Sequence, residues 1–340
     1  MAAKFVPSLQ QILYRLVSVA SDESLKAPVS NNPGRFPVVV RPETRAFLEA
    51  QANYLGGSIA GVAGAILDGV AMSTQGRDAG VSALKGISDR FGVLIQEHDL
   101  SVPAAVEALT DLGLALDDFS SSEALQRRLS SKVLREVALR FFVGYDWLAG
   151  KSEFTASPSP HSWYKSVEFA AATLDQAMRD ADAVEFSLYL KKGADLSCTD
   201  DERDWNRLPH FIPVLKRSAA LPGGESLDTY EVWEEGRWSY WRCRHHIKLV
   251  TYFAYHRGIH VRGQTLSEDD YDALLNGRSL PATVIKRAPR IGTWHPDDYV
   301  LPGSAAAKDA AEWKTIEKDK DNAGTFKLFK QLLSMEAREL

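Results

Sequence analysis

The chain has 340 residues, of which 45% are hydrophobic and 25% charged, and its formal net charge at pH 7 is −5. This composition is typical of a folded protein with two or three domains, and it excludes a disordered tail or a fibre. Two cysteines, Cys198 and Cys243, are too few for a disulfide framework or a four-thiolate metal site. Because the sequence shows neither a long apolar run nor a secretion signal, we expect a cytoplasmic protein.

Residues 1–35 predict a short amphipathic helix followed by a linker. Apolar residues recur at helical spacing over residues 4–20, and residues 21–35 are rich in Ser, Asn and Pro. No segment of the chain is strongly basic, so composition gives no support to nucleic-acid binding. Evidence for such binding has to come from local motifs.

Residues 36–76 contain the first motif. A β-branched run at 38–40 predicts a strand, Pro42 begins a helix, a Gly-Gly pair ends that helix, and Ser58 can cap a second one. This order of strand, helix, glycine turn and Ser-capped helix resembles the ribbon-helix-helix family of DNA-binding proteins. A unit of this size is too small to hold a core alone.

The resemblance implies that two copies interlock and that their strands form an antiparallel ribbon in the major groove of DNA. Arg35 and Arg41 would contact DNA at the ends of the strand, and Ser58 would present a helix N-terminus to a phosphate. The strand itself carries valines where the family has polar side chains that read bases. The alternative is an oligomerisation unit, or a strand and helical hairpin within a larger domain. Small residues at every fourth position of the second helix favour that alternative.

Residues 77–150 contain the second motif. Apolar spacing predicts two short helices joined around Ser101, and a later helix that ends before Gly144 and an Asp-Trp-Leu-Ala-Gly segment. Both ends of residues 88–150 resemble the phage-repressor-like helix-turn-helix family. The resemblance implies that a third helix enters the major groove and that its polar residues contact DNA. These residues are Ser121, Ser122, Gln126, Arg127 and Arg128.

Acidic residues lie beside this expected reading helix. Asp117, Asp118 and Glu123 would repel phosphate, and the alternative for this domain is a helical bundle that mediates protein contacts. Two resemblances to DNA-binding folds in tandem nevertheless favour sequence-specific binding of double-stranded DNA. We therefore expect a multidomain protein whose amino-terminal half is ribbon-helix-helix-like and then all-α and helix-turn-helix-like.

A linker at residues 151–162, with two prolines and four serines, separates this half from a mixed α/β (α+β) domain at residues 163–301, in which we recognise no family. The sequence of that domain predicts a strand that ends at Gly193, a hairpin around Gly236 and a helix that ends at Gly258. In the hairpin, the glycine is expected to supply a positive φ. Residues 302–340 predict a closing helical tail whose Phe and Leu stripe docks on another surface.

The centre of the mixed domain is basic and aromatic. No acidic residue occurs from Gly236 to Ser267, and the cations there alternate with aromatic rings. This combination suits an anionic ligand with a π face, or a single nucleic-acid strand. The alternative is that the rings fill a core and the arginines pair with acidic residues near Asp200. The residues expected to contact a ligand are Arg237, Trp238, Tyr240, Arg242 and Arg244.

Catalytic and metal-binding patterns are weak. His256 and His260 have zinc-like spacing, but the helix-breaking Gly258 lies between them. We expect no enzyme, cofactor or metal, and instead a DNA-binding transcriptional regulator that forms homo-oligomers, responds to a small-molecule or protein effector and has no membrane partner. One alternative is a nucleic-acid-processing enzyme with a metal site formed by acidic residues near Asp200 and histidines near His245. Another is an assembly adaptor of a mobile element that does not bind DNA.

Overall fold

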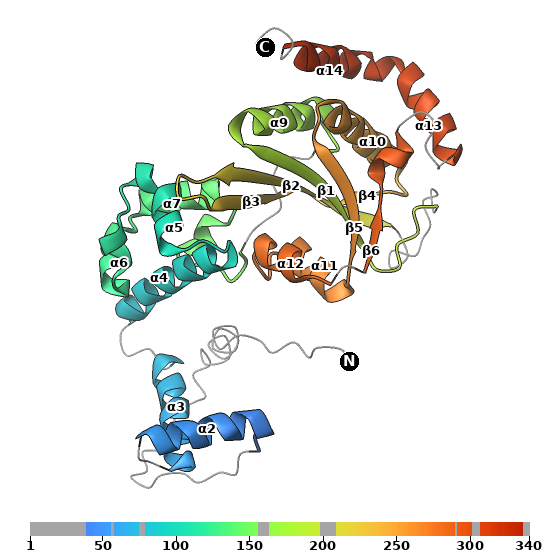
Figure 1. Ribbon diagram of the computed structural model, residues 1–340. Coiled ribbons are helices and arrows are strands. Elements are labelled where there is room, and N and C mark those ends of the chain that lie inside the picture. The colour runs from blue at the N-terminus through green and yellow to red at the C-terminus, as the bar shows by residue number, and fades with distance from the viewer. Residues whose placement is uncertain are drawn as a thin grey trace. The chain divides into compact units, whose positions relative to one another are not determined.

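The computed structural model describes residues 39–55, 58–74, 79–155, 163–197, 209–289, 291–300 and 307–335. The chain divides into two compact units, Met1–Ala83 and Leu84–Leu340. Helices and a mixed sheet both occur, so the expected mixed helix-and-sheet class is confirmed (Figure 1). None of the described helices is long and apolar enough to cross a membrane.

The first unit contains two helices that pack against each other, α2 (Pro42–Leu55) and α3 (Ile59–Thr74). Both lie where the sequence predicts helices, and Ser58 caps α3 because its Oγ accepts a hydrogen bond from the backbone N–H of Gly61 at 3.0 Å. Val39 and Val40 are not part of a strand, and residues 36–38 lie outside the described residues. The expected ribbon pairs strands of two chains, so it stays a prediction.

The second unit begins within α4 with a helical bundle, and each of the helices α4 to α8 contributes to its core. Three of these helices are capped by the serine that precedes them. Ser101, Ser121 and Ser130 each accept a hydrogen bond from the backbone N–H three residues ahead, at 3.3, 3.1 and 3.3 Å. The helices are α4 (Ala79–Glu97), α5 (Val102–Ala108), α6 (Ser122–Arg128), α7 (Ser131–Arg140) and α8 (Tyr145–Leu148).

The segment between α5 and α6 contains two 3-10 turns, η1 (Thr110–Leu112) and η2 (Leu116–Phe119), where the helix-turn-helix family has a short turn. Asp118, which was expected to repel phosphate, turns inward instead. Its carboxylate accepts a hydrogen bond from the backbone N–H of Ala115 at 2.9 Å and pairs with Arg128 at 3.0 Å. These two contacts hold the pKa of the Asp118 carboxyl below its ordinary value and tie the loop to α6.

The rest of the second unit is built on a mixed sheet with the strand order β3–β2–β1–β5–β6, in which β4 pairs with the start of β2. β1 and β5 are parallel, whereas the other neighbouring strands are antiparallel. The crossover that a parallel pair requires contains helix α10 (Trp241–His256). The strands are β1 (Ala183–Lys191), β2 (His210–Ala220), β3 (Ser226–Val232), β4 (Gly236–Arg237), β5 (His260–Leu266) and β6 (Gly292–Trp294).

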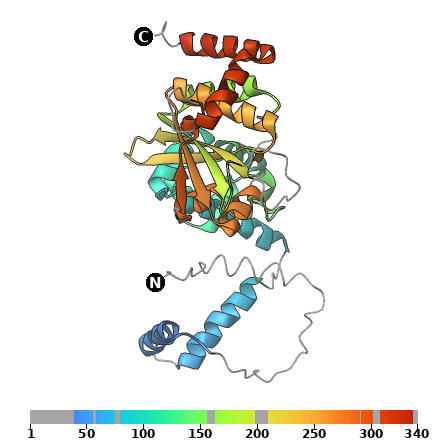
Figure 2. The ribbon, with the colours of Figure 1, turned by 90° about the vertical axis from the view of Figure 1, so that its right-hand side faces the viewer.

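Helices cover both faces of this sheet, as Figures 1 and 2 show. Successive strand residues point to opposite faces, so Phe186 and Leu188 of β1 pack with α9 and α10, while Tyr189 packs with α11 and α12. Phe329 of α14 lies in the same core as α9 and α10. The remaining helices are α9 (Val167–Asp180), α11 (Glu268–Leu275), α12 (Pro281–Arg287), η3 (Pro296–Tyr299), α13 (Ala307–Lys318), η4 (Lys320–Asn322) and α14 (Ala323–Met335).

The hairpin expected around Gly236 is wrong in two respects. β4 pairs with β2 rather than with β3, and the chain from Trp241 onward already belongs to α10. Gly236 is not among the residues with a positive φ. A Cβ at this position would instead lie 2.3 Å from a ring carbon of Phe211 and 2.7 Å from one of Trp163. Close packing, not a turn, therefore requires this glycine.

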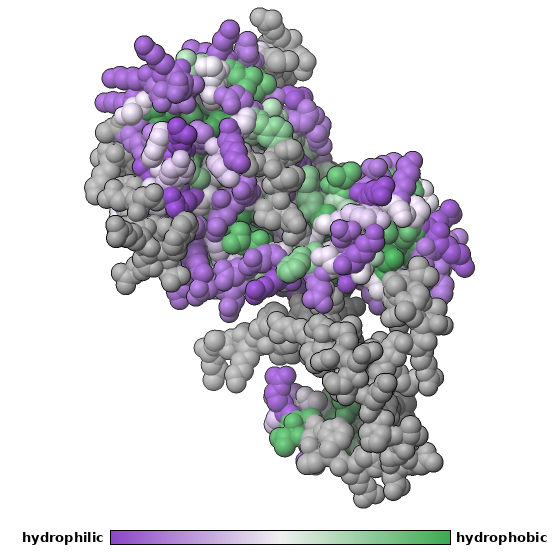
Figure 3. Space-filling view, turned by 180° about the vertical axis from the view of Figure 1, so that it is seen from behind, coloured by the Kyte–Doolittle hydropathy of each residue, from purple (hydrophilic) through white to green (hydrophobic). Residues whose placement is uncertain are grey.

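The bundle and the sheet pack together within the second unit. Leu227 of β3 and Leu280, which precedes α12, are part of the bundle's core. The hydroxyl of Thr155 lies 3.0 Å from the carbonyl oxygen of Gly277 and 2.8 Å from that of Ser279. Thr155 belongs to the expected linker, of which residues 156–162 lie outside the described residues. Seen from behind, the exposed surface of the second unit is mainly hydrophilic, with separate hydrophobic patches (Figure 3).

Candidate nucleic-acid interface

The DNA contacts expected in the first unit are described only in part. Arg35 lies outside the described residues, and Arg41 is exposed immediately before α2. Ser58 is exposed and uses its hydroxyl as the cap of α3. These two described residues lie at the starts of successive helices.

The five residues expected on the reading helix of the second motif lie on or directly before α6. Ser121 is its cap and Ser122 its first residue. Gln126 is half-buried, and its amide donates a hydrogen bond to the hydroxyl of Ser88 on α4 at 3.2 Å. Arg128 forms the ion pair with Asp118, although 58% of its side chain stays exposed. Arg127 is exposed and has no ion-pair partner among the described residues.

Charge in the bundle is divided between two segments. Residues 84–121 contain two basic and seven acidic side chains, whereas residues 122–151, which include α6, α7 and α8, contain six basic and three acidic ones. The negative balance of the whole bundle therefore conceals a basic part that begins with α6. That part is the one with the expected reading helix.

Three of the acidic side chains are used where the bundle meets the sheet. Glu97, in the last turn of α4, pairs with Arg287 of α12 at 2.8 Å. Asp99 pairs with Lys286 of α12 at 2.7 Å, and Glu107 accepts a hydrogen bond from the backbone N–H of Gly223 at 2.8 Å. These carboxylates face the sheet domain, so they are not free to repel a polyanion at α6.

Further exposed cations lie on α7 and after α8. Lys132 and Arg135 are exposed on α7. The guanidinium of Arg135 and the ammonium of Lys151 lie 5.3 and 5.4 Å from the centre of the Tyr145 ring, which holds both by cation–π attraction. Sequence reasoning missed these residues, although the change in charge balance at residue 122 is visible in the sequence. Together, Arg127, Arg128, Lys132, Arg135 and Lys151 are called the α6–α7 basic face.

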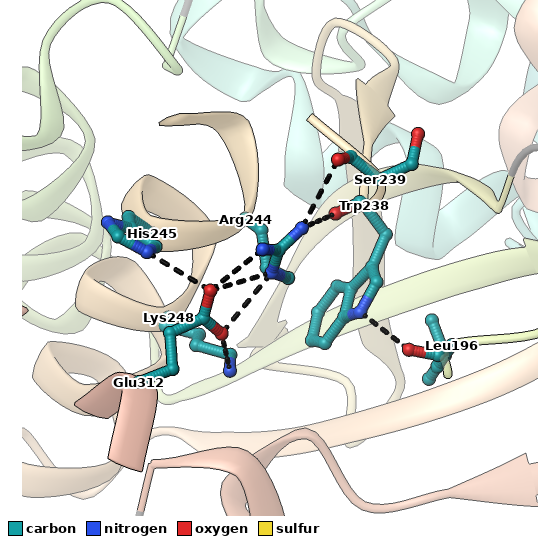
Figure 4. Close-up of polar contacts among 7 residues, drawn as sticks. All are labelled: Leu196, Trp238, Ser239, Arg244, His245, Lys248 and Glu312. Atoms are coloured by element: carbon teal, nitrogen blue, oxygen red, sulfur yellow. Dashed lines mark hydrogen bonds and ion pairs between the residues drawn. The ribbon is translucent and has the colours of Figure 1, made fainter. Parts of the chain in front are cut away.

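The five ligand contacts expected in the mixed domain do not form one surface. Trp238 is 2% exposed and donates its indole N–H to the carbonyl oxygen of Leu196 at 3.0 Å. Arg244 is 6% exposed and binds backbone oxygens as well as Glu312 (Figure 4). Both side chains thus have internal partners. Arg237, Tyr240 and Arg242 lie nearer the surface, around the start of α10.

Glu312 joins the carboxyl-terminal helices to the sheet domain. Its carboxylate reaches from α13 to three side chains of α10, at 2.8 Å from Arg244, 3.1 Å from His245 and 2.5 Å from Lys248 (Figure 4). Burial alone would raise the pKa of the Glu312 carboxyl, but the hydrogen bonds from these three side chains outweigh it and hold the pKa far below its ordinary range. Sequence reasoning missed this cluster because Glu312 is distant from α10 in the chain.

The residues considered for a metal site have other roles. Cys243 is buried, which raises the pKa of its thiol to about 11, and its sulfur accepts a hydrogen bond from the backbone N–H of Arg237. His245 pairs with Glu312, and His246 contacts the carbonyl oxygen of Tyr164. Within the described residues no cluster of metal-binding side chains occurs. The acidic residues from Asp200 to Asp204 lie outside them.

Comparison with known proteins gives no match, because no family model, no curated protein and no solved structure is significantly similar to this chain.

Proposed function

We propose that this protein is a sequence-specific DNA-binding regulator and that its α6–α7 basic face contacts double-stranded DNA. The separation of charge within the bundle is the observation that carries the proposal. Basic side chains outnumber acidic ones from residue 122 to residue 151, while Glu97, Asp99 and Glu107 are used against the sheet domain. Affinity for DNA depends on basic groups near the phosphates, and local charge decides it rather than net charge.

The way α6 is held supports the same proposal. Ala124 and Leu125 are buried in the bundle, whereas Arg127 and Arg128 are exposed. In Figure 1, α6 lies at the edge of the bundle that is far from the sheet. Arg127 at this position can contact a phosphate or the edge of a guanine.

The first unit supports a homo-oligomer. Only Leu48 and Ala52 are buried among its described side chains, while large apolar residues of both helices and of the segment before α2 are exposed. Two helices of this size bury too little surface to be stable alone, so a second copy is the simplest source of a core. An oligomer places two bundles on one DNA molecule, which raises the effective concentration of the second bundle. The exposed apolar residues are Val39, Val40, Phe47, Ile59, Ile66 and Leu67.

The proposal is tested by selection from a library of random duplex DNA with the full chain at about physiological salt, where non-specific phosphate contacts are weak. The expected result is enrichment of a short repeated half-site. A variant with Arg127→Ala and Arg135→Ala should fail to enrich it. The matched control, Lys192→Ala with Arg278→Ala, removes two exposed cations of the sheet domain and should enrich the same half-site. No enrichment by the unaltered chain would overturn the proposal.

A further inference from the structure

A cavity of about 430 Å³ lies on the face of the sheet that is covered by α12. Its floor is formed by β1, β2, β3 and β5, and its walls are formed by α12 and by Asp99 of the bundle, which lies just beyond the end of α4. The volume is within the range of small-molecule binding sites. The cavity-lining residues that enter the argument are Asp99, Glu185, Lys216, Asp228, Tyr230, Arg262, Gln264 and Lys286.

The charged groups of this cavity are already paired. Lys216 lies 2.7 Å from Asp228, and Arg262 lies 3.1 Å from Glu185. Lys286 lies 2.7 Å from Asp99, which completes a third pair at the wall. Three cations and three carboxylates leave the lining without net charge. A ligand with a net charge would upset this balance, and an apolar ligand would leave polar groups without partners.

Two polar side chains of the cavity have unused hydrogen-bonding capacity. Tyr230 is 4% exposed, and its hydroxyl has no hydrogen-bond partner among the described residues. Gln264 is half-buried, and its amide likewise contacts no polar group of those residues. Both groups line the open cavity rather than the closed core, so a molecule in the cavity can reach them. A ligand that both donates and accepts hydrogen bonds here would supply the missing partners.

We propose that this cavity binds a small, uncharged, polyhydroxylated molecule, either a saccharide or the sugar of a nucleoside. Hydroxyl groups donate to the carboxylates of Glu185 and Asp228 and accept from Lys216 and Arg262, so they can join the ion pairs without breaking them. A zwitterion such as an amino acid would have to displace those pairs to satisfy its own charges. Tyr230 and Gln264 then bind the hydroxyls or ring oxygen that remain.

The position of the cavity also links it to the bundle. Asp99 is the bundle residue in the wall of the cavity, and it forms an ion pair with Lys286 of α12. A ligand that contacts either side chain changes the contact between the bundle and the sheet domain. This step rests on the proposed function. Through the contact between the bundle and the sheet domain, the bound polyol acts as an effector that changes the affinity of the protein for DNA.

Binding is tested without DNA, so that failure of the cavity and failure of the proposed function give different results. The full chain is titrated calorimetrically with six neutral compounds: D-ribose, D-glucose, D-galactose, N-acetyl-D-glucosamine, adenosine and uridine. The zwitterion glutamine and the anion AMP are titrated for comparison. Saturable binding of at least one of the six neutral compounds is expected. Absence of such binding, or preferential binding of glutamine or AMP, would overturn the proposal.

The site is located by two variants. Tyr230→Phe removes only a hydroxyl and should weaken binding of the neutral compound about fivefold, as expected for one lost hydrogen bond. Tyr255→Phe removes the hydroxyl of a tyrosine on α10 that is 47% exposed and should leave the affinity unchanged. Equal affinities of the two variants would place the ligand elsewhere. The effector role is then tested by measuring the affinity for the selected DNA with and without the compound that binds. An unchanged affinity would contradict the effector role but not the binding of the compound in the cavity.

Discussion

Lys286 of α12 contacts the carboxyl-terminal end of α4. Its ammonium lies 2.7 Å from the Asp99 carboxylate and 3.2 Å from the carbonyl oxygen of Glu97. A cation at the carboxyl end of a helix stabilises the helix dipole and satisfies a carbonyl that has no partner within the helix. Asp99 has a φ of 56°, which is in the left-handed region that Asp and Asn tolerate better than most residues. A residue of the sheet domain therefore helps to define where the first bundle helix stops.

Replacement of Lys286 by Ala is expected to destabilise the second unit by about 1 kcal/mol, because an ion pair and a hydrogen bond at a helix end are lost. Urea unfolding measures the change. Lys192→Ala, which removes an exposed lysine that follows β1, should change the free energy of unfolding by less than about 0.5 kcal/mol. Equal effects of the two substitutions would mean that Lys286 adds nothing to the junction of bundle and sheet.

His98 makes stability depend on pH. It is 3% exposed, and its Nδ1–H donates a hydrogen bond to the carbonyl oxygen of Leu94 at 2.7 Å. Burial lowers the pKa of the imidazole from 6.5 to about 4 in the folded protein. The unfolded chain therefore takes up this proton first as pH falls, and stability decreases from pH 6.5 down to about pH 4.

The expected loss over that interval is about 3 kcal/mol, the free energy that corresponds to the difference between the two pKa values. Urea unfolding at a series of pH values should show this loss in the unaltered chain and a flatter profile in His98→Gln. His260→Gln, at an exposed position at the start of β5, serves as the control and should keep the original slope. A profile in His98→Gln that is as steep as in the unaltered chain would contradict the assignment.

Glu312 is expected to hold the carboxyl-terminal helices in place. Glu312→Gln removes the negative charge that faces Arg244, His245 and Lys248, and Lys248 is only 1% exposed. Loss of one partner from a buried ion cluster costs about 3 kcal/mol. Limited proteolysis should therefore cleave near α13 faster in this variant than in Glu317→Gln, which alters an exposed position on the same helix. Identical cleavage rates would show that the cluster does not fasten α13.

The same carboxylate adds a second, more acidic step to the stability profile. Because the folded state holds the pKa of Glu312 below the ordinary value of 4.5, the unfolded chain binds this proton first and stability falls as pH decreases below about 4.5. This step should be absent in Glu312→Gln, whereas the step caused by His98 at higher pH should remain. Both steps can be read from one series of unfolding curves.

The exposed apolar side chains of the first unit should mediate self-association. Phe47 is 55% exposed and Leu67 is 46% exposed. Substitution of both by Glu places charge on any interface that they form, and sedimentation should then show a monomer where the unaltered chain forms an oligomer. Phe154→Glu changes an equally exposed ring of the second unit and should leave the oligomer intact. A monomeric unaltered chain would contradict the oligomer directly.

Local signals in the sequence were reliable guides to local structure. Ser58, Ser101 and Ser121 each cap the helix that was expected to follow, because a cap depends only on the next three residues. Gly236 was misread since a glycine that permits a turn and a glycine that permits close packing look alike in a sequence. The ring of Phe211, against which Gly236 packs closely, belongs to another strand, so the sequence around Gly236 does not show this contact.

The cavity could not be predicted because its residues are assembled by strand register. Ser187 lies opposite Arg262 across a parallel pair, and Lys216 lies opposite Tyr230 across an antiparallel pair. The spacing of residues within one segment of the sequence does not show which residues are neighbours across two strands. The same limit explains Trp238 and Arg244: their residue types suit ligand contact, but burial and a carboxylate 68 residues away from Arg244 give them internal partners instead.

The most direct test of the account is the salt dependence of binding to a selected DNA site. Each phosphate contact contributes about 0.9 to the slope of log affinity against log salt concentration. Replacement of Arg127 and Arg135 by Ala is expected to weaken binding and to reduce that slope by about 2, while the variant with Lys192→Ala and Arg278→Ala keeps the original slope. An unchanged slope in the first variant would show that DNA, if bound at all, is bound by another surface.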